Sequence, residues 1–570
     1  MIDRLSAGTR ATSLVPYALW ALSIGTLIYG AYQVWHHWWL CDDAFISFRY
    51  AQNLVNGHGL VYNVGERVEG YTNFLWTIII SFFMLLELRP EPVSMVLGAA
   101  SYFATVGILG YLSWRLFNRA EPKGTIFFPL AAMCVLVQHD YHVFATSGLE
   151  TSWTAMLVTL GYALLVLARS PRSYLWAGIV LILAALSRPD AMLFYAMGIP
   201  YLLLLGRMER RYVFLYLVPL VIMYLPYWVA RYLYYGFPFP NTYYAKSANL
   251  PYYSQGIAYL KLYFKAYYSL MLLGPAALAV ILFRFRALVS LRSNAPVYRA
   301  LALGILFAVP YTAYVVRSGG DFMFARFFIP VTPILFLFLE ATMRLFLVRT
   351  WAYVPVSLVV LAGVLFRWDP YTETRKIDYV AYEPDYYPRS WVEHAEEVGT
   401  RMREYFKGTD TRVAFYGMFA VYVYYAEPSM AIESNAGLTD TFIAHMPIFN
   451  RGRPGHEKQA PWEYLVHRGV NFVFRGKVPM NTPTDSLRAI RFGDFESHII
   501  VYNRALMDHL KQFPEIAFVD FPAFLDGYIA RMPSIPNDAL APSYQFFRQY
   551  YFDHNDDPAR QRPFITRLGG

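Results

Sequence analysis

Long apolar stretches alternate with short polar segments through the first two thirds of the chain. The apolar runs occupy residues 14–35, 72–88, 93–114, 125–138, 153–168, 174–187, 191–206, 212–230, 267–283, 300–316, 327–343 and 351–366. A helix needs about 20 mainly apolar residues to cross a bilayer, so the shorter runs must include flanking polar residues. No small-residue cleavage site follows the first run, so it is expected to stay as an anchor.

Basic residues between the runs predict the orientation, because Lys and Arg are enriched in cytoplasmic loops. They mark the N-terminus and, from residue 115 onward, every second loop: Arg4, Arg10, Arg115, Arg119, Lys123, Arg169, Arg172, Arg207, Arg210, Arg211, Arg284, Arg286, Arg292, Arg299, Arg344 and Arg349. Segments 36–71, 139–152, 188–190, 231–265 and 317–326 are therefore expected outside. An odd number of crossings must separate residue 71 from residue 115, so one of the runs 72–88 and 93–114 is expected not to span. This gives about 11 spans and an external C-terminus.

The pattern changes after residue 368. Residues 369–410 are charged and rich in tyrosine, residues 412–425 have the composition of a strand, and residues 461–475 indicate a helix followed by a strand. We therefore expect a polytopic α-helical membrane domain at residues 1–368 and a soluble α/β domain on the outer side at residues 369–570, long enough for its own core.

Composition supports this division. Of the 570 residues 56% are hydrophobic and 18% aromatic, and only 16% are charged, whereas about a quarter is usual in soluble domains. The net charge of +9 is accounted for by topology signals, so no nucleic-acid partner is expected. Cys134 lies inside an apolar run, and Cys41 is the other cysteine, so a disulfide framework is not expected.

Two adjacent carboxylates, Asp42 and Asp43, follow the first apolar run. Carboxylates at a membrane edge cost little free energy only if they are solvated, paired or used in function. In one interpretation they cap the amphipathic helix that follows. In the other, one of them is a general base or a metal ligand that faces a lipid-borne substrate.

Three cations in later outer segments are candidates for binding a phosphate. Lys246 is a point charge suited to that role. Arg326 opens a span, where it could bind a phosphate at the headgroup level or pair with Asp321. Arg188 could snorkel or pair with an acid. Asp190 is expected to cap the following helix.

Other polar residues of these segments and of the soluble domain are candidates for substrate binding: Arg49, His58, Glu69, Tyr71, Asn73, Glu150, Asn241, Tyr244, Asp321 and His456. Gly57 and Gly59 permit tight turns that could bring Glu69 and Asn73 near the aspartates. Alternatively, this segment is a hairpin with solvated charges. The histidine pairs at 36–37 and 139–142 lack ligand spacing, so no metal site is expected.

Several motifs resemble a known family. They are DDAFISFRYAQNLVNGHGLVYN with VEGYTNFLW, SGLET, SRPD, PNTYYAK, SGGDFMFARFFIP, GLTD at 437–440 and RPGHEK at 453–458. In this order they resemble the terminal arabinofuranosyltransferases of the mycobacterial cell wall, which belong to the GT-C superfamily of polyprenyl-phosphate-sugar-dependent transferases. The acidic pair in the first external loop is the hallmark of that superfamily.

The resemblance implies a pentosyltransferase of the plasma membrane with an extracytoplasmic active site. Asp42 or Asp43 would act on the acceptor hydroxyl as the catalytic carboxylate. The donor lipid would be decaprenyl-phosphate-arabinofuranose, and the polysaccharide acceptor would be the arabinan of arabinogalactan or lipoarabinomannan. A monophosphate leaving group needs no cofactor, although a divalent cation is compatible with the mechanism. Lys246, Arg188 and Arg326 would neutralise the leaving phosphate.

The soluble domain could hold the acceptor through Asp440, His456 and Lys458, unless these are turn and capping residues. The nearest alternative is the same fold with another polyprenyl-phosphate sugar, such as mannose or another hexose, or with a protein acceptor. An alternative of another class is a lipid or sugar transporter, which predicts pseudo-repeats and charged residues in mid-span. Only Glu340 is expected in the middle of a span, and no repeat is visible.

Overall fold

A computed structural model describes residues 6–117, 127–204, 210–290, 296–347, 350–474 and 483–569. Some of the basic residues that predict the orientation lie outside the described residues: Arg4, Arg119, Lys123, Arg207, Arg292 and Arg349. The chain divides into two compact units. The helical unit comprises Met1–Ala44, Thr72–Pro238 and Ala248–Pro388, and the α/β unit comprises Phe45–Tyr71, Phe239–Ser247 and Arg389–Gly570.

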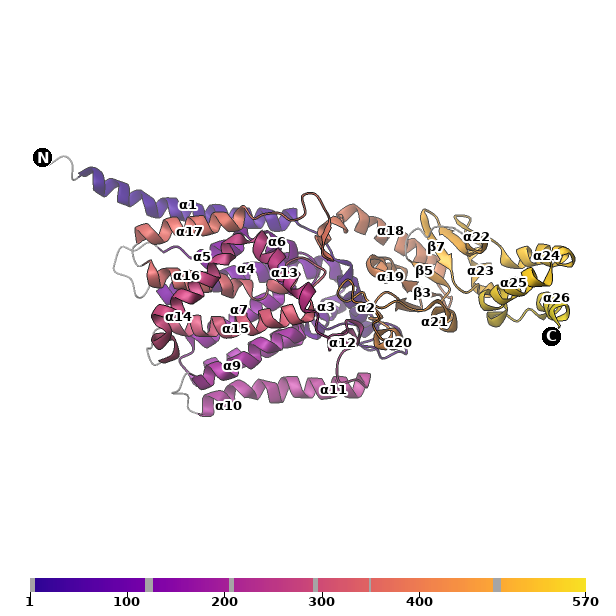
Figure 1. Ribbon diagram of the computed structural model, residues 1–570, viewed down its shortest axis with the longest axis horizontal. Helices are drawn as coiled ribbons and strands as arrows, with labels where there is room; N and C mark the ends of the chain where they lie inside the picture. The colour runs from indigo at the N-terminus through magenta and orange to yellow at the C-terminus, as the bar shows by residue number, and fades with distance from the viewer. Residues whose placement is uncertain are drawn as a thin grey trace. The chain divides into compact units, whose positions relative to one another are not determined.

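The helical unit contains long apolar helices, several of which run in roughly the same direction in Figure 1. Its α-helices are α1 (Ser6–His36), the start of α2 (Asp42–Val55), α3 (Phe74–Leu85), α4 (Pro90–Phe117), α5 (Leu130–Val137), α6 (His139–Ala145), α7 (Thr151–Leu167), α8 (Pro171–Ser187), α9 (Met192–Leu204), α10 (Arg210–Pro219), α11 (Leu225–Tyr235), α13 (Tyr253–Ala266), α14 (Leu273–Ser290), α15 (Pro296–Ser318), α16 (Thr332–Phe346) and α17 (Thr350–Leu365). A π-helical turn, Leu220–Tyr224, joins α10 to α11.

Three helices in the described residues are long and apolar enough to cross a membrane: Pro90–Phe117, Arg210–Tyr235 and Pro296–Ser318. A fourth span is possible if the pair Tyr253–Ala266 and Tyr268–Arg284, bent by 102°, is counted as one. One of the apolar runs 72–88 and 93–114 is expected not to span the membrane. The run 93–114 lies within the 28-residue α4. The run 72–88 contains α3, whose 12 residues extend only about 18 Å against the roughly 30 Å of a bilayer core. The expected total of about 11 spans stays a prediction.

Glycines let some helices of this unit approach closely, as small residues do in membrane bundles. The clearest case is Gly256 in α13, which faces α15. A Cβ atom at Gly256 would lie 1.9 Å from the carbonyl oxygen of Val316. Any side chain at this position would therefore force the backbones of the two helices apart.

The α/β unit is built on a six-stranded sheet of order β4-β3-β5-β7-β6-β8. Its strands are β3 (Arg412–Phe415), β4 (Met430–Glu433), β5 (Phe472–Phe474), β6 (Ala489–Phe492), β7 (Phe495–Ile499) and β8 (Ile516–Phe518). Strands β4, β3 and β5 are parallel, and the others pair antiparallel. In the register, Val413 pairs with Ala431 on one side and with Phe472 on the other.

The helices of the C-terminal part of the chain are α18 (Arg389–Phe406), α19 (Ala420–Ala426), α20 (Thr441–His445), α21 (Trp462–His467), α22 (Pro483–Arg488), α23 (Arg504–Leu510), α24 (Phe521–Arg531), α25 (Asn537–Tyr550) and α26 (Pro558–Leu568). They are drawn from orange to yellow in Figure 1, where α24, α25 and α26 lie beyond the labelled strands, towards the C-terminus. Buried aliphatic residues such as Ile432, Leu465 and Val473 form a core cluster. The expected α/β region in the C-terminal part is confirmed.

Two segments from the N-terminal two thirds of the chain also belong to the α/β unit. They are residues 45–71, which include most of α2, and residues 239–247, which include α12 (Asn241–Ala245). Conversely, residues 369–388 pack with the helical unit. The compact units therefore do not follow the expected division after residue 368, because packing groups segments that are distant in the sequence.

Two local predictions in this region had different outcomes. In the run 461–475, of which the structure describes 461–474, helix α21 is followed by β5, as predicted. The strand prediction for 412–425 was wrong beyond Phe415, where a 3-10 turn (Gly417–Phe419) and α19 follow. Gly417 has a φ of 46° and ends the extended backbone. Because α19 is buried on most faces, its residues form an apolar run without helical periodicity, which cannot be told from a buried strand.

The contact at Gly256 predicts that Gly256→Ala destabilises the helical unit by about 1–3 kcal/mol, as overpacking does. A matched control is Gly274→Ala in α14, because a Cβ there meets no atom within 4 Å. Thermal unfolding of the purified protein in detergent measures both. The Tm should fall for Gly256→Ala and stay equal or rise for the control. Equal Tm values for the two variants would contradict the close approach of α13 and α15.

Candidate functional site

Asp42 and Asp43 occupy the first turn of α2, within the helical unit. The main chain just before them is fixed, because the Cys41 N–H donates to the Ser147 carbonyl at 3.0 Å. Gly148, with a φ of +79°, packs against Leu40 and Ala44. The SGLET motif is therefore folded directly against the residues that flank the acidic pair.

The two aspartates have different surroundings. Asp42 is only 6% exposed. It accepts hydrogen bonds from the Cys41 thiol at 3.4 Å and from the Tyr387 hydroxyl. The Asp43 side chain is 29% exposed, and its Oδ2 lies 3.8 Å from Nη1 of Arg326. Asp42 is thus enclosed by protein groups, whereas Asp43 is accessible.

Arg326 lies among three carboxylates. It begins a 3-10 turn, Arg326–Phe328, after Ala325, whose φ is 62°. Its guanidinium lies 3.8 Å from Asp43, 3.5 Å from Glu150 and 3.6 Å from Asp321. These separations are longer than good charge-assisted hydrogen bonds, and Nε of Arg326 is buried without a partner. The arginine is held by charge more than by close hydrogen bonds.

Arg188 is held more tightly. Its Nε and Nη2 both donate to Asp190 at 3.0 Å, and Nη1 donates to Glu150 at 3.3 Å. The Tyr311 hydroxyl donates to the same Asp190 carboxylate at 2.8 Å. The prediction that Asp190 caps the next helix was therefore wrong, since its oxygens bind the Arg188 fork and a phenol.

Glu150 joins these pairs into one network. Its Oε1 lies within 3.5 Å of both arginines, and its Oε2 accepts from the Asn73 amide at 3.0 Å. We call the acid cluster the set Asp42, Asp43, Glu150, Asp190, Asp321, Arg188 and Arg326. In it four carboxylates contact the two guanidinium groups, and Asp42 adjoins them through its neighbour Asp43. No group of three or more His, Cys, Asp or Glu in the described part of the chain could hold a metal ion.

The electrostatics of the acid cluster follow from burial and this excess of acids. Burial, and then the negative charge of Asp43, raise the pKa of Asp42 to about 7. Burial also opposes ionisation of Asp190, but the charge and hydrogen bonds of Arg188 outweigh it and lower the pKa of that carboxyl. One aspartate of the acid cluster is therefore poised to hold a proton near neutral pH, while another is fixed as an anion.

The structure thus brings together some of the residues predicted for the site: Asp42, Asp43, Asn73, Glu150, Arg188, Asp321 and Arg326. The other predicted site residues lie in the α/β unit: Arg49, His58, Glu69, Tyr71, Asn241, Tyr244, Lys246 and His456. Sequence reasoning missed Tyr387 and Tyr311, which bind Asp42 and Asp190. The chain is rich in tyrosine, so no local signal distinguishes these two from the others.

Two predicted substrate-binding residues in the α/β unit bind main-chain carbonyl groups. Arg49 donates to the carbonyls of Tyr62, Val423 and Pro428 at 3.0, 3.3 and 2.9 Å. The Asn241 amide donates to the carbonyls of Gly437 and Leu438. These two side chains tie residues 45–71 and 239–247 to the C-terminal part of the unit.

The other candidates in this unit vary in exposure. Lys246 is exposed, and its side chain passes near Gly455. Glu69 and Tyr71 are buried, and Tyr71 packs on Tyr50. His58 is exposed. The remaining two make local contacts: the Tyr244 ring stacks on His445, and Nδ1 of His456 lies 3.2 Å from the Pro454 carbonyl.

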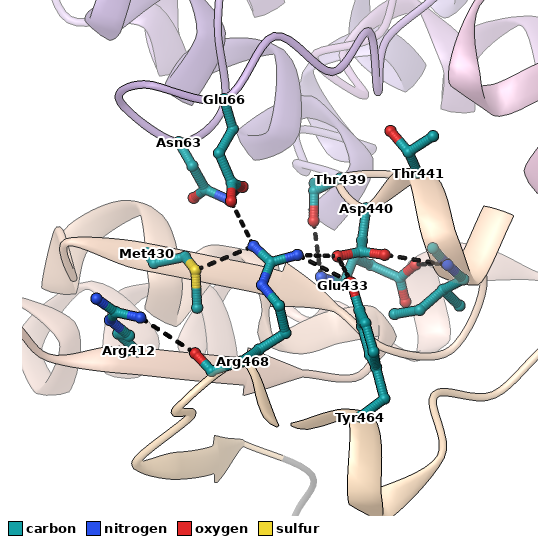
Figure 2. Close-up of polar contacts among 12 residues, drawn as sticks. Asn63, Glu66, Arg412, Met430, Glu433, Thr439, Asp440, Thr441, Tyr464 and Arg468 are labelled. Atoms are coloured by element: carbon teal, nitrogen blue, oxygen red, sulfur yellow. Dashed lines mark hydrogen bonds and ion pairs between the residues drawn. The ribbon is translucent and has the colours of Figure 1, made fainter. Parts of the chain in front are cut away.

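Figure 2 shows a polar network in the α/β unit around Arg468. The guanidinium of Arg468 binds the carboxylates of Glu66 and Asp440, the latter at 2.6 Å. Asp440 also accepts from the Tyr464 hydroxyl and from the Ile443 N–H, and thereby caps α20. The two oxygens of Asp440 thus bind protein groups of this unit, in agreement with the capping interpretation.

The chain is similar to two curated proteins named terminal beta-(1->2)-arabinofuranosyltransferase. With the Mycobacterium tuberculosis protein it shares 28% identity over 340 residues, 55% of this chain and 54% of that protein. With the Corynebacterium glutamicum protein it shares 29% over 356 residues, 56% of this chain and 51% of that protein. The chain spans about half the length of these relatives. The resemblance inferred from the motifs is confirmed.

Among solved structures, one similar chain is the oligosaccharyltransferase of Archaeoglobus fulgidus, in a complex with Zn and sulfate. The TM-score is 0.40, with 11% sequence identity, and the match covers 79% of this chain and 68% of that chain. No family model matches the chain.

The raised pKa of Asp42 predicts a pH dependence of stability. In the folded protein this pKa is about 7, and in an unfolded chain it is about 3.9. Between these values the folded state holds an additional proton, so the free energy of unfolding should fall as the pH rises from about 4 to about 7. Asp42→Asn should remove this fall.

Thermal unfolding at about pH 5 and about pH 8 measures the effect. The control is Asp556→Asn, since Asp556 is exposed and its substitution should keep the pH dependence of the parent protein. If Asp42→Asn keeps the same difference in Tm between the two pH values as the parent, the raised pKa of Asp42 is wrong.

Proposed function

We propose that this protein is a membrane glycosyltransferase that moves arabinofuranose from decaprenyl-phosphate-arabinose to an arabinan of the cell envelope. The observation that carries the proposal is the placement of Asp43 beside Arg326 within one polar cluster of an apolar helical unit. A carboxylate for the acceptor hydroxyl and a cation for the leaving phosphate are the two groups that such a transfer needs. The similarity to the named arabinofuranosyltransferases adds the sugar.

The protein lies in the plasma membrane with its active site and C-terminal α/β region on the extracytoplasmic side. The basic residues of alternate loops support this orientation. The fold of the helical unit is then of the GT-C type, as the acidic pair in the first external loop implies.

Asp43 is the general base in this mechanism. The acceptor hydroxyl oxygen forms a bond to the anomeric carbon, the bond from that carbon to the phosphate oxygen breaks, and the hydroxyl proton passes to Asp43. The accessibility of Asp43 and its contact with Arg326 support this role. Asp42 is only 6% exposed and is enclosed by Cys41 and Tyr387, so it positions the turn of α2 rather than taking the proton.

Arg326 is the best candidate among the three cations for the donor phosphate. Its three carboxylate contacts are long, so phosphate oxygens can replace one of them at little cost in hydrogen bonding. Arg188 is bound to Asp190 by two bonds of 3.0 Å and is less able to exchange partners. Lys246 belongs to the α/β unit, where it is exposed, and its role at the donor phosphate stays a prediction.

The base assignment predicts that Asp43→Asn lowers the transfer rate by about 10²–10⁴-fold, because the amide cannot accept the proton. Asp42→Asn should lower it less, by about tenfold or below, since Asn keeps the shape of the side chain. Proteoliposomes containing radiolabelled arabinosyl-phosphate lipid and an arabinan oligosaccharide measure the rate. Parallel assays with a mannosyl-phosphate lipid test the alternative sugar. A greater loss in Asp42→Asn than in Asp43→Asn would overturn the assignment.

The phosphate assignment predicts that Arg326→Gln weakens donor binding at least about tenfold, because a charge-assisted hydrogen bond to phosphate is lost. Arg326→Lys should keep part of the affinity because it keeps the charge. Arg188→Gln is the comparison and should lower the Tm more than the donor affinity, since Asp190 is left buried without its partner. Unchanged donor affinity in Arg326→Gln would show that the phosphate binds elsewhere.

A further inference from the structure

An apolar groove lies between α4 and α7 in the helical unit. Its volume is about 540 Å³, within the roughly 300–1,000 Å³ that ligand sites usually have. The lining residues are Ala104, Gly107, Ile108, Tyr111 and Arg115 of α4, Leu160, Ala163, Leu164 and Leu167 of α7, and Ser173 of α8. These positions recur every three or four residues, so each helix presents one continuous stripe to the groove.

Small residues open the groove. Gly107 is exposed, and a Cβ built on it meets no atom within 4 Å. Ala104 lies one turn earlier on α4, and Ala163 lines the facing side. Because α4 is long and apolar enough to span a membrane, this open stripe is at the depth of lipid acyl chains.

One end of the groove is basic. Arg115 lines it in the last turn of α4, and the guanidinium lies 5.8 Å from the centre of the Tyr111 ring. The exposed Arg169, between α7 and α8, and the exposed Arg172, in the first turn of α8, add to this basic end. The described segments 104–117 and 160–176 contain no Asp or Glu. This end therefore attracts an anion, and Tyr111 is the kind of residue found at a membrane–water interface.

The groove is separate from the acid cluster. Glu150 precedes the first residue of α7, whereas Leu167, which lines the groove, ends that helix. The 17 residues of α7 place the two ends about 25 Å apart. The groove thus opens to the leaflet opposite the proposed active site, and a ligand there would not take part in sugar transfer.

We propose that this groove binds one glycerophospholipid with an anionic headgroup. The headgroup phosphate accepts hydrogen bonds from the Arg115 guanidinium, and one acyl chain lies along the stripe formed by Gly107, Leu160 and Leu164. The combination of an apolar stripe with cations at one end matches a membrane lipid, whose apolar chain and charged phosphate are separated in the same way. A free phosphate would leave the stripe uncovered.

Native mass spectrometry of the full-length protein in detergent, titrated with phosphatidylglycerol, tests this. Arg115→Gln should weaken binding of the first phosphatidylglycerol about fivefold, the loss expected for one arginine near a headgroup. The parent should bind phosphatidylcholine less tightly than phosphatidylglycerol, and excess inorganic phosphate should not displace the lipid. Equal affinity of Arg115→Gln and the parent for phosphatidylglycerol, or displacement by phosphate alone, would overturn the proposal.

A second pair of variants distinguishes loss of lipid binding in the groove from a general effect of the substitution on folding. Gly107→Leu fills the stripe, whereas Gly110→Leu adds the same side chain three residues further along α4, at a position where a Cβ also meets no atom within 4 Å and which does not line the groove. Gly107→Leu should lose at least about fivefold in lipid affinity, and Gly110→Leu should match the parent. Equal lipid affinity in the two leucine variants would overturn the proposal. Sugar transfer should be retained in both, so its loss through Asp43→Asn remains an independent result.

Discussion

The sharing of Glu150 between two arginines is the interaction on which the proposed site depends. Glu150 precedes α7, Arg188 follows α8, and Arg326 begins a turn before α16, so one carboxylate fixes three distant segments. Asn73, just before α3, adds a fourth through its amide. Removing one partner of such a buried pair typically costs about 3–5 kcal/mol, because the other charge is left uncompensated. The same contacts that hold the helix ends together therefore bring Arg326 to Asp43.

The lengths of the individual contacts separate the tightly held Arg188 from the loosely held Arg326. Two hydrogen bonds of 3.0 Å join Arg188 to Asp190, and the Tyr311 hydroxyl donates a further hydrogen bond to the same carboxylate. The contacts of Arg326 with carboxylates are all 3.5 Å or longer. A tight bidentate pair is stable and selective, but it leaves little capacity for a ligand. Loosely held charge among several acids is better suited to a site where a substrate phosphate enters and leaves.

Polar residues of the sequence motifs also hold distant segments of the α/β unit together. Arg49, Asn241 and Lys458 donate to main-chain carbonyl groups of segments far apart in the sequence. Asn63 pairs through its side-chain amide with the N–H and carbonyl of Ala431, at the outer strand β4 of the sheet. Buried polar groups need such partners. Part of the motif pattern is therefore explained by the way segments 45–71 and 239–247 are joined to the sheet.

The sequence by itself determined the alternation of apolar helices, the C-terminal α/β region and the position of the acidic pair after the first apolar run, because apolar periodicity and the order of polar residues are local properties. It could not decide that Asp42 is enclosed while Asp43 is accessible, since Tyr387 reaches Asp42 from 345 positions further along the chain. Nor could it predict that Asp190 would bind Arg188 instead of capping a helix, or that residues 420–426 would form a helix. These outcomes depend on which distant groups meet, and only the tertiary structure fixes those partners.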